Sequence, residues 1–249
     1  MSIDVVDLRS FYVQRLGAVA RHLVGRGIRR RWTDIRGQRV LGIGYATPYL
    51  GLFREEAERT LAFMPAAQGV VKWPTAKPAL SALVDDLELP LPDAAVDRVL
   101  LVHALEMSND PTALLREIWR VLASGGQLLA VVPNRRGLWA RMDTTPFGHG
   151  RPYSRSQVMT LLRDAWFTPV DWSEALFVPP IQNSWFLRSA FAWERVGAII
   201  SSPFAGVHIV EATKQVYRAI PAKRAKRRLI PALEPALAPS PGGAARQAQ

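Results

Sequence analysis

From residue 40 to about residue 180 the chain alternates between short apolar stretches and amphipathic stretches, and this alternation limits strongly how it can fold. The clearest pair is "DPTALLREIWRVLASGG" followed by "QLLAVVP". The first stretch has apolar residues at helical spacing behind an Asp110 N-cap, and the second is a continuous apolar run. A strand joined so closely to a helix is typical of a parallel sheet that is covered on both faces. The alternation therefore predicts an α/β protein with a doubly wound, mostly parallel sheet.

The remaining elements are expected from local patterns. Apolar residues at steps of three and four, with arginines on the other side, predict an N-terminal amphipathic helix that serves as a lid or packs on the core: Val5, Leu8, Tyr12, Leu16, Val19 and Leu23. Strands are expected at residues 40–41, 60–64, 83–84, 96–103, 127–133, 169–180 and 206–218. Helices are expected at residues 48–58, after Pro78, from Pro111 to "SGG", and at 154–167 behind a Ser154 or Ser156 cap. A helical insertion is expected at 182–200, and disorder in the last eighteen or so residues.

The net charge of +11 is concentrated near the two ends of the sequence. Residues 1–39 hold nine arginines against three aspartates, residues 214–249 hold eight Lys or Arg against Glu234 alone, and the part between them carries −2. A nucleic-acid-binding domain usually carries its positive charge on its folded surface, so no specific nucleic-acid partner is expected. The basic ends could touch anionic surfaces weakly or serve only as solvated, basic segments. We divide the chain into an N-terminal helical lid or cap at 1–39, a main domain at 40–220, and a tail at 221–249 that is first basic and then rich in Pro and Ala.

The composition points to a cytoplasmic protein. The chain has 249 residues and no cysteine, which excludes disulfides and thiolate metal sites and is compatible with a reducing compartment. We find no uninterrupted apolar run long enough to cross a bilayer. Acidic and basic residues are scattered through the first thirty positions, where a signal peptide would need an apolar core.

The stretch "VLGIGYATPYL" reads as a strand, a tight glycine turn and a helix start at Pro48. A phosphate or sugar could sit against such a turn. Thr47 stands where the third glycine of a GxGxxG dinucleotide loop would be, and no acidic residue follows at the usual distance. An NAD-type enzyme is therefore disfavoured.

Four motifs in order carry a family resemblance: this glycine stretch, "LVDDLELPLPDAAVDRVLLVHALE", "DPTALLREIWRVLASGGQLLAVVPN" and "HGRPYSRSQVMTLLRDAWF". Together they resemble the class I S-adenosylmethionine (SAM)-dependent methyltransferases of the small-molecule, type 11 kind over residues 40–170. The resemblance implies a Rossmann-like sheet of seven strands, one of them reversed near an edge. It also implies SAM as the cofactor, lying across the carboxyl ends of the first strands.

The resemblance also implies which residues would meet SAM. The glycine loop supplies Gly42, Gly44, Tyr45 and Ala46, and the end of the second strand supplies Met64. The adenine would lie against Asp85, Asp86 and Leu87, and the His103 backbone carbonyl would lie beneath the sulfonium. Gly42 and Met64 stand where the family usually has carboxylates that hold the methionine amine and the ribose. Loss of two charged hydrogen bonds could weaken SAM binding by about one to four orders of magnitude.

Candidate chemistry lies in "FGHGRPYS". His149 could act as a general base, Tyr153 could position the methyl acceptor and Arg151 could bind an anionic acceptor. His149 could equally tie the loop down by hydrogen bonds. Glu106 could touch the substrate, although a solvated charge at a helix start is the simpler interpretation. No arrangement of residues has metal-ligand spacing.

Two main hypotheses follow for function. The first is a SAM-dependent methyltransferase for a small or lipid-like acceptor. The second is a methyltransferase-fold protein without catalysis that acts as a scaffold or regulatory subunit of a protein partner. The altered glycine loop is what keeps the second hypothesis open.

Overall fold

The computed structural model describes residues 3–181 and 205–215. The strands are β1 (Arg39–Gly44), β2 (Arg59–Pro65), β3 (Ser81–Val84), β4 (Val96–Val102), β5 (Leu122–Pro133), β6 (Phe167–Ala175) and β7 (Val207–Lys214). The α-helices are α1 (Val5–Val13), α2 (Arg15–Arg31), α3 (Thr47–Leu50), α4 (Pro111–Val121) and α5 (Arg155–Asp164). Two short 3₁₀ helices, η1 (Trp139–Arg141) and η2 (Pro146–Gly148), follow β5.

The strands form one seven-stranded sheet in the order β3-β2-β1-β4-β5-β7-β6. The pairs among the first five strands are parallel, whereas β7 runs antiparallel to both β5 and β6. The doubly wound, mostly parallel sheet with a reversed strand near one edge is therefore confirmed. The order reverses direction between β1 and β4, where open α/β sheets bind ligands.

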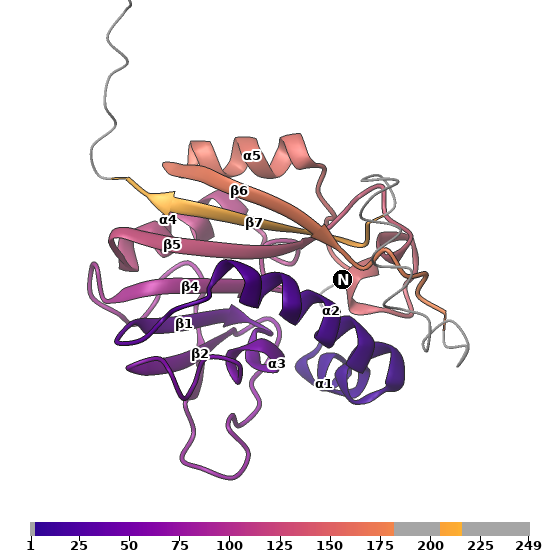
Figure 1. Ribbon diagram of the computed structural model, residues 1–249, viewed down its shortest axis with the longest axis horizontal. Helices are drawn as coiled ribbons and strands as arrows, with labels where there is room; N and C mark the ends of the chain where they lie inside the picture. The colour runs from indigo at the N-terminus through magenta and orange to yellow at the C-terminus, as the bar shows by residue number, and fades with distance from the viewer. Residues whose placement is uncertain (1–2, 182–204, 216–249) are drawn as a thin grey trace, which may run out of the picture. The chain divides into compact units, whose positions relative to one another are not determined.

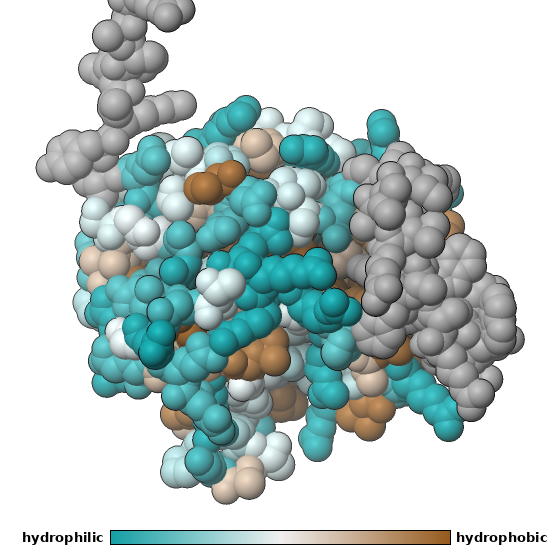
Figure 2. All heavy atoms as spheres, in the orientation of Figure 1, coloured by the Kyte–Doolittle hydropathy of each residue, from teal (hydrophilic) through white to brown (hydrophobic). Residues whose placement is uncertain are grey.

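Helices cover both faces of the sheet (Figure 1). One apolar cluster packs α1, α2 and the turn after β1 against one face, and a second packs α4 and α5 against the other. The apolar side of α2 faces the sheet, and Figure 2 shows hydrophilic side chains over its outward side. None of the described helices is long and apolar enough to cross a membrane.

Helix starts follow the expected capping residues. The Asp110 carboxylate accepts a hydrogen bond from the Ala113 amide at 2.9 Å, and Pro111 begins α4. Ser154 caps α5 and forms a reciprocal capping box with Gln157. These short-range contacts satisfy amide groups that have no partner within a helix.

The single N-terminal helix expected from the apolar stripe is instead two helices. The backbone of Gln14 is extended (ψ 161°), so the chain turns between α1 and α2. Gly17 permits the turn, because a Cβ there would lie 2.0 Å from the Phe11 carbonyl oxygen. The stripe continues across the turn because both helices bury their apolar sides in the same cluster.

Three other expectations about helices were wrong. The helix expected at 48–58 ends at Leu50, and turns follow through Gly51, a residue that weakens helices. No helix follows Pro78, because residues 79 and 80 lead directly into β3. The "SGG" sequence lies inside β5, because α4 ends at Val121 and the strand starts immediately.

Some expectations fall outside the described residues. The helical insertion at 182–200, the domain boundary at residue 220 and the disordered tail are among them.

Candidate functional site

The carboxyl ends of four neighbouring strands meet at one edge of the sheet. Gly44 of β1 pairs with Val102 of β4, and Pro65 of β2 pairs with Val84 of β3. The residues that follow these ends therefore lie along a common rim. This rim holds most of the residues that the family resemblance assigns to the cofactor.

The glycine turn after β1 is packed against β4. Gly44 has φ +78°, and a Cβ there would lie 2.2 Å from the Val102 carbonyl oxygen. The next residue, Tyr45, donates its amide hydrogen to that oxygen at 2.8 Å. A Cβ on Gly42 would meet Leu50 and Ala46. Both glycines therefore allow close internal packing of the turn.

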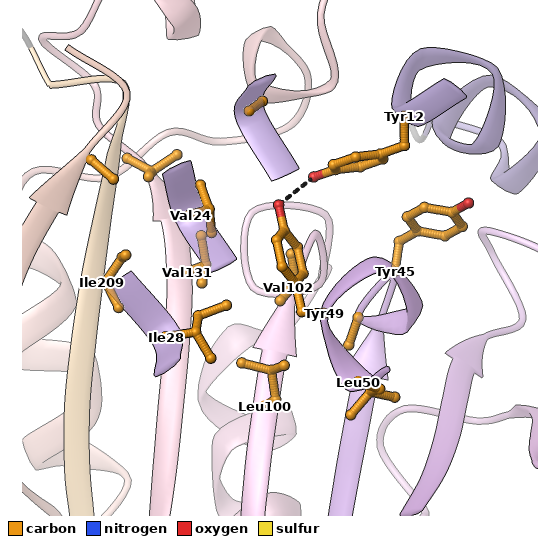
Figure 3. Packing of buried hydrophobic residues seen from close by; sticks show 14 of the residues in the cluster. Tyr12, Val24, Ile28, Tyr45, Tyr49, Leu50, Leu100, Val102, Val131 and Ile209 are labelled. Atoms are coloured by element: carbon orange, nitrogen blue, oxygen red, sulfur yellow. Dashed lines mark hydrogen bonds between the residues drawn. The ribbon is translucent and has the colours of Figure 1, made fainter. Parts of the chain in front are cut away.

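Three tyrosines lie together above this turn (Figure 3). Tyr12 of α1 stacks on Tyr45, with ring centroids 5.6 Å apart, and its hydroxyl lies 3.1 Å from that of Tyr49. Burial raises the pKa of Tyr12 well above its ordinary value and also raises the pKa of Tyr45 and of Tyr49. All three are neutral at physiological pH and act as hydrogen-bonding groups.

His103 follows β4 and connects this cluster to a buried carboxylate. Its Nε2 lies 2.9 Å from the Tyr12 hydroxyl, and its Nδ1 lies 3.1 Å from Oε1 of Glu106. Both His103 and Glu106 are about 1% exposed, so Glu106 is not the solvated charge that was considered. Oε2 of Glu106 has no hydrogen-bond partner among the described residues. His103 also has φ +51°, a conformation rare outside glycine and enriched at functional sites.

Gln68 joins the same cluster from the loop after β2. Its side-chain amide donates to the His103 carbonyl oxygen, the group expected to lie beneath the sulfonium. The backbone carbonyl of Gln68 accepts the amide hydrogen of Val5 at 2.8 Å. The first turn of α1 is therefore held at the rim together with Tyr12.

The residues expected at the adenine lie at the open end of the rim. Asp85 is exposed, and its Oδ1 accepts the Leu87 amide hydrogen at 2.9 Å. Burial raises the pKa of Asp86. Leu87 is 46% exposed, whereas Met64 is 1% exposed and packs in the core. At this end of the rim, the Asp85 carboxylate and the apolar Leu87 side chain are therefore both accessible to a ligand.

The loop between β5 and α5 packs against the segment after β4. The Tyr153 hydroxyl donates to the Leu105 carbonyl at 3.3 Å, and the Arg151 amide donates to the Glu106 carbonyl at 2.8 Å. His149 Nε2 lies 2.9 Å from the Asp143 carbonyl oxygen, a bond that ties the loop down. Tyr153 and the Arg151 backbone thus adjoin Glu106, while the His149 side chain is bonded within the loop.

His149 lines a hollow of about 460 Å³ between α1 and this loop. Asp7, Ser10 and Gln14 of the N-terminal region lie on one side, and Thr145 and Pro146 lie on the other. The hollow has polar and apolar walls, which is common in pockets for small molecules. No group of three or more His, Cys, Asp or Glu that could hold a metal ion occurs in the described parts of the chain.

Sequence reasoning did not assign Tyr12, Tyr49 or Gln68 to the site. Tyr12 appeared only as one member of the apolar stripe, and Gln68 had no local signal. Tyr12 and His103 are 91 positions apart, so no sequence window shows their contact. The three-residue step from His103 to Glu106 was the one available hint of a hydrogen-bonded pair.

Comparison with known proteins supports the same fold and family. Residues 24–130 match a family described as Methyltransferase domain. A probable SAM-dependent methyltransferase of Mycobacterium tuberculosis is 40% identical over 85 residues, which is 33% of this chain and 31% of that protein. Ajmaline N-methyltransferase of Rauvolfia serpentina is 30% identical over 98 residues, 38% of this chain and 32% of the relative. The matches thus span about a third of the length of these curated relatives.

Solved structures agree on the fold. A SAM-dependent methyltransferase of Thermotoga maritima, described as a possible histamine N-methyltransferase, superposes with a TM-score of 0.58 at 17% identity, covering 85% of this chain and 96% of that one. A methyltransferase of Haloferax volcanii, solved with the Trm112 activator, superposes with a TM-score of 0.55 at 18% identity, covering 78% of this chain and 89% of that one. Strand order, motif order and these matches agree, and together they support a class I SAM-dependent methyltransferase family for this chain.

Proposed function

We propose that this chain is an active methyltransferase that uses SAM to methylate a small or lipid-like acceptor. The observation that most supports this proposal is the rim where β1, β2, β3 and β4 end. The residues that the family resemblance implies for SAM lie along this rim. When bound, SAM supplies an electrophilic methyl group on a positively charged sulfur. The protein must bind the cofactor, align the acceptor and receive a proton.

The rim residues fit SAM at two places. Glu106 offers a buried carboxylate oxygen that has no hydrogen-bond partner in the described part of the chain, which suits a cationic group such as the sulfonium or the methionine amine. Asp85 is an exposed carboxylate at the other end, suited to the adenine amino group, with Leu87 as apolar cover. The turn Gly42–Ala46 would hold the part of the cofactor between them, and Met64 and Asp86 would border it.

Tyr12 covers the middle of the rim in the structure. Its ring lies on Tyr45 and its hydroxyl is bonded to His103. We therefore infer that α1 moves from this position when the cofactor enters. Together with the absence of the two usual carboxylate anchors, this movement makes SAM binding weak, in about the micromolar range or poorer.

The hollow beside His149 is the proposed acceptor site. A carbonyl oxygen can only accept, so Nε2 of His149 donates to Asp143, which leaves Nδ1 of the neutral ring as a proton acceptor. Tyr153, bonded through its hydroxyl to a backbone carbonyl, positions the loop beside Glu106. Arg151 would attract an anionic acceptor. We also propose that a protein partner binds this chain, by analogy with the Haloferax volcanii methyltransferase that was solved in complex with an activator.

Calorimetric titration with SAM and with its demethylated product tests the proposal. We expect saturable heat and an increase in the melting temperature at about 1 mM ligand. Asp85→Ala is expected to weaken binding about tenfold, since it removes a charged hydrogen-bond acceptor. Asp164→Ala at the end of α5 is the matched control and should bind like the parent protein. Absence of both heat and thermal stabilisation at millimolar ligand would overturn the proposal and leave a methyltransferase fold without its cofactor.

A further inference from the structure

A second hollow, of about 550 Å³, lies along α5 and beside β6 and β7. His208 of β7 lines it, and its chain neighbours Val207 and Ile209 pack in the cluster with α1 and α2. Since successive side chains of a strand point to opposite faces, His208 faces the α5 side of the sheet. This hollow is therefore on the other face of the sheet from the tyrosine cluster and the proposed cofactor rim.

The walls of the hollow are rich in groups that bind anions. Arg136, Arg155 and Arg163 line it, together with the hydroxyls of Ser154 and Ser156 at the start of α5. The Gln157 amide is already bonded to the Ser154 hydroxyl, but the start of this ten-residue helix also carries the positive end of its dipole. The Arg155 guanidinium lies 5.0 Å from the centroid of the Trp172 ring, which positions its charge beside the hollow.

His208 gives an independent indication of a ligand. It is 3% exposed, and neither of its ring nitrogens has a hydrogen-bond partner among the described residues. Its Nδ1 lies 3.3 Å from Oε1 of Glu174, and its ring lies 4.7 Å from that of Trp172. Buried polar groups in folded proteins are almost always satisfied. An imidazole that lines a hollow and whose Nε2 has no hydrogen-bond partner among the described residues is suited to bond a molecule that enters it.

We propose that this hollow binds a small molecule through a phosphate monoester group. Three arginines against the single carboxylate of Glu174 favour a doubly charged anion over a singly charged one. Guanidinium groups match phosphate oxygens in a bidentate geometry, and helix amides and hydroxyls add further donors. The volume is in the range of sites for metabolite-sized ligands, so room remains for the part of the molecule that bears the phosphate.

Calorimetry with inorganic phosphate and with glucose 6-phosphate, at fixed ionic strength, tests the site. Arg136→Ala and Arg155→Ala should each weaken binding of both probes about tenfold or more, because each removes a charged hydrogen-bond donor. Arg116→Ala is the matched control: Arg116 also lies over a tryptophan ring, 5.2 Å from Trp166, but on α4 and outside the hollow. It should bind both probes like the parent protein. His208→Gln should weaken binding less than the arginine changes.

The outcomes separate the proposal from general charge attraction. Equal losses of affinity for the probes in Arg116→Ala and Arg155→Ala would overturn the proposal. So would the absence of saturable binding of either probe to the parent protein. Binding only to vesicles that contain phosphatidic acid would also overturn it, since the phosphate would then belong to a membrane surface. Because Arg136, which follows β5, and Arg155 of α5 are both exposed, their variants should fold even if the buried His208 variant does not.

Discussion

Gly44 is the residue on which the geometry of the glycine turn most depends. Its positive φ is strained for any other residue, and the space where a Cβ would lie is taken by the Val102 carbonyl oxygen. That oxygen also accepts the Tyr45 amide hydrogen, so it cannot move away without loss of a hydrogen bond. A single position thus joins the ends of the first and fourth strands.

Gly44→Ala is therefore expected to destabilise the protein by about 3 kcal/mol or more, from backbone strain and steric clash together. Gly37→Ala is the matched control, because Gly37 also has a positive φ (+69°) but has nothing within 4 Å of its Cβ position. It should cost only about 1 kcal/mol, the strain alone. Urea unfolding of both variants gives the comparison. If the two variants lose similar free energies of unfolding, the steric contact of position 44 with β4 contributes little to the cost.

At the level of elements, α1 is held at the rim by a few polar contacts. Tyr12 joins Tyr49 and His103, and Gln68 connects the start of α1 to the His103 carbonyl. The helix has only nine residues, too few to be stable alone, so its position depends on these contacts and on its buried side chains. This is the arrangement expected of an element that moves when a ligand binds.

Tyr12→Phe is expected to lower the free energy of unfolding by about 1–3 kcal/mol, since it leaves His103 Nε2 and the Tyr49 hydroxyl without a buried partner. Val13→Ala, which changes a side chain 80% exposed on the same helix, should cost less than about 0.5 kcal/mol. Denaturant unfolding measures both. A negligible loss in Tyr12→Phe would mean that the hydroxyl does not hold α1 in place.

At the scale of the whole molecule, stability should depend on pH through the Glu117–Arg120 pair of α4, whose side chains also bond the backbone of the segment between β3 and β4. Hydrogen bonds from Arg120 hold the pKa of the Glu117 carboxyl below its usual value, and Glu117 also accepts the Leu89 amide hydrogen at 2.7 Å. A carboxyl whose pKa is lowered in the folded state stabilises the protein above its unfolded pKa, near 4.3. That stabilisation is lost as the pH falls through the lower, folded pKa.

Glu117→Gln should accordingly reduce the free energy of unfolding by about 1–2 kcal/mol at pH 7, with the difference from the parent shrinking below about pH 4. The Glu117 side chain is 12% exposed, so solvent screens this interaction little. Asp93→Asn is the matched control, because Asp93 binds the same arginine but is 80% exposed. It should change stability by less than about 0.5 kcal/mol at any pH. Urea unfolding at pH 7, 5 and 3.5 measures the free energy of unfolding of both variants and of the parent. If the difference between Glu117→Gln and the parent is the same at all three pH values, the pKa of Glu117 is not lowered in the folded protein.

The sheet, its winding and most helix starts could be predicted from the sequence because they depend on short-range patterns. Apolar runs, amphipathic spacing and the caps at Asp110 and Ser154 act within a few residues, and the structure confirms them. The same reasoning failed where packing competes with local preference. Examples are the turn at Gln14 and the early end of the helix after Pro48.

The sequence by itself determined an α/β fold with a doubly wound, mostly parallel sheet, although the first strand is longer than expected and ends at Gly44 rather than Leu41. Only the tertiary structure decided that Tyr12 covers the rim, that Glu106 is buried beside His103, and that His208 lines a basic hollow on the opposite face. The physical reason is that burial and long-range contact are not visible in a short window of sequence. Tyr12 and His103 are 91 positions apart, and the burial of the neighbouring pair His103 and Glu106 follows only after the sheet and α1 have packed around it.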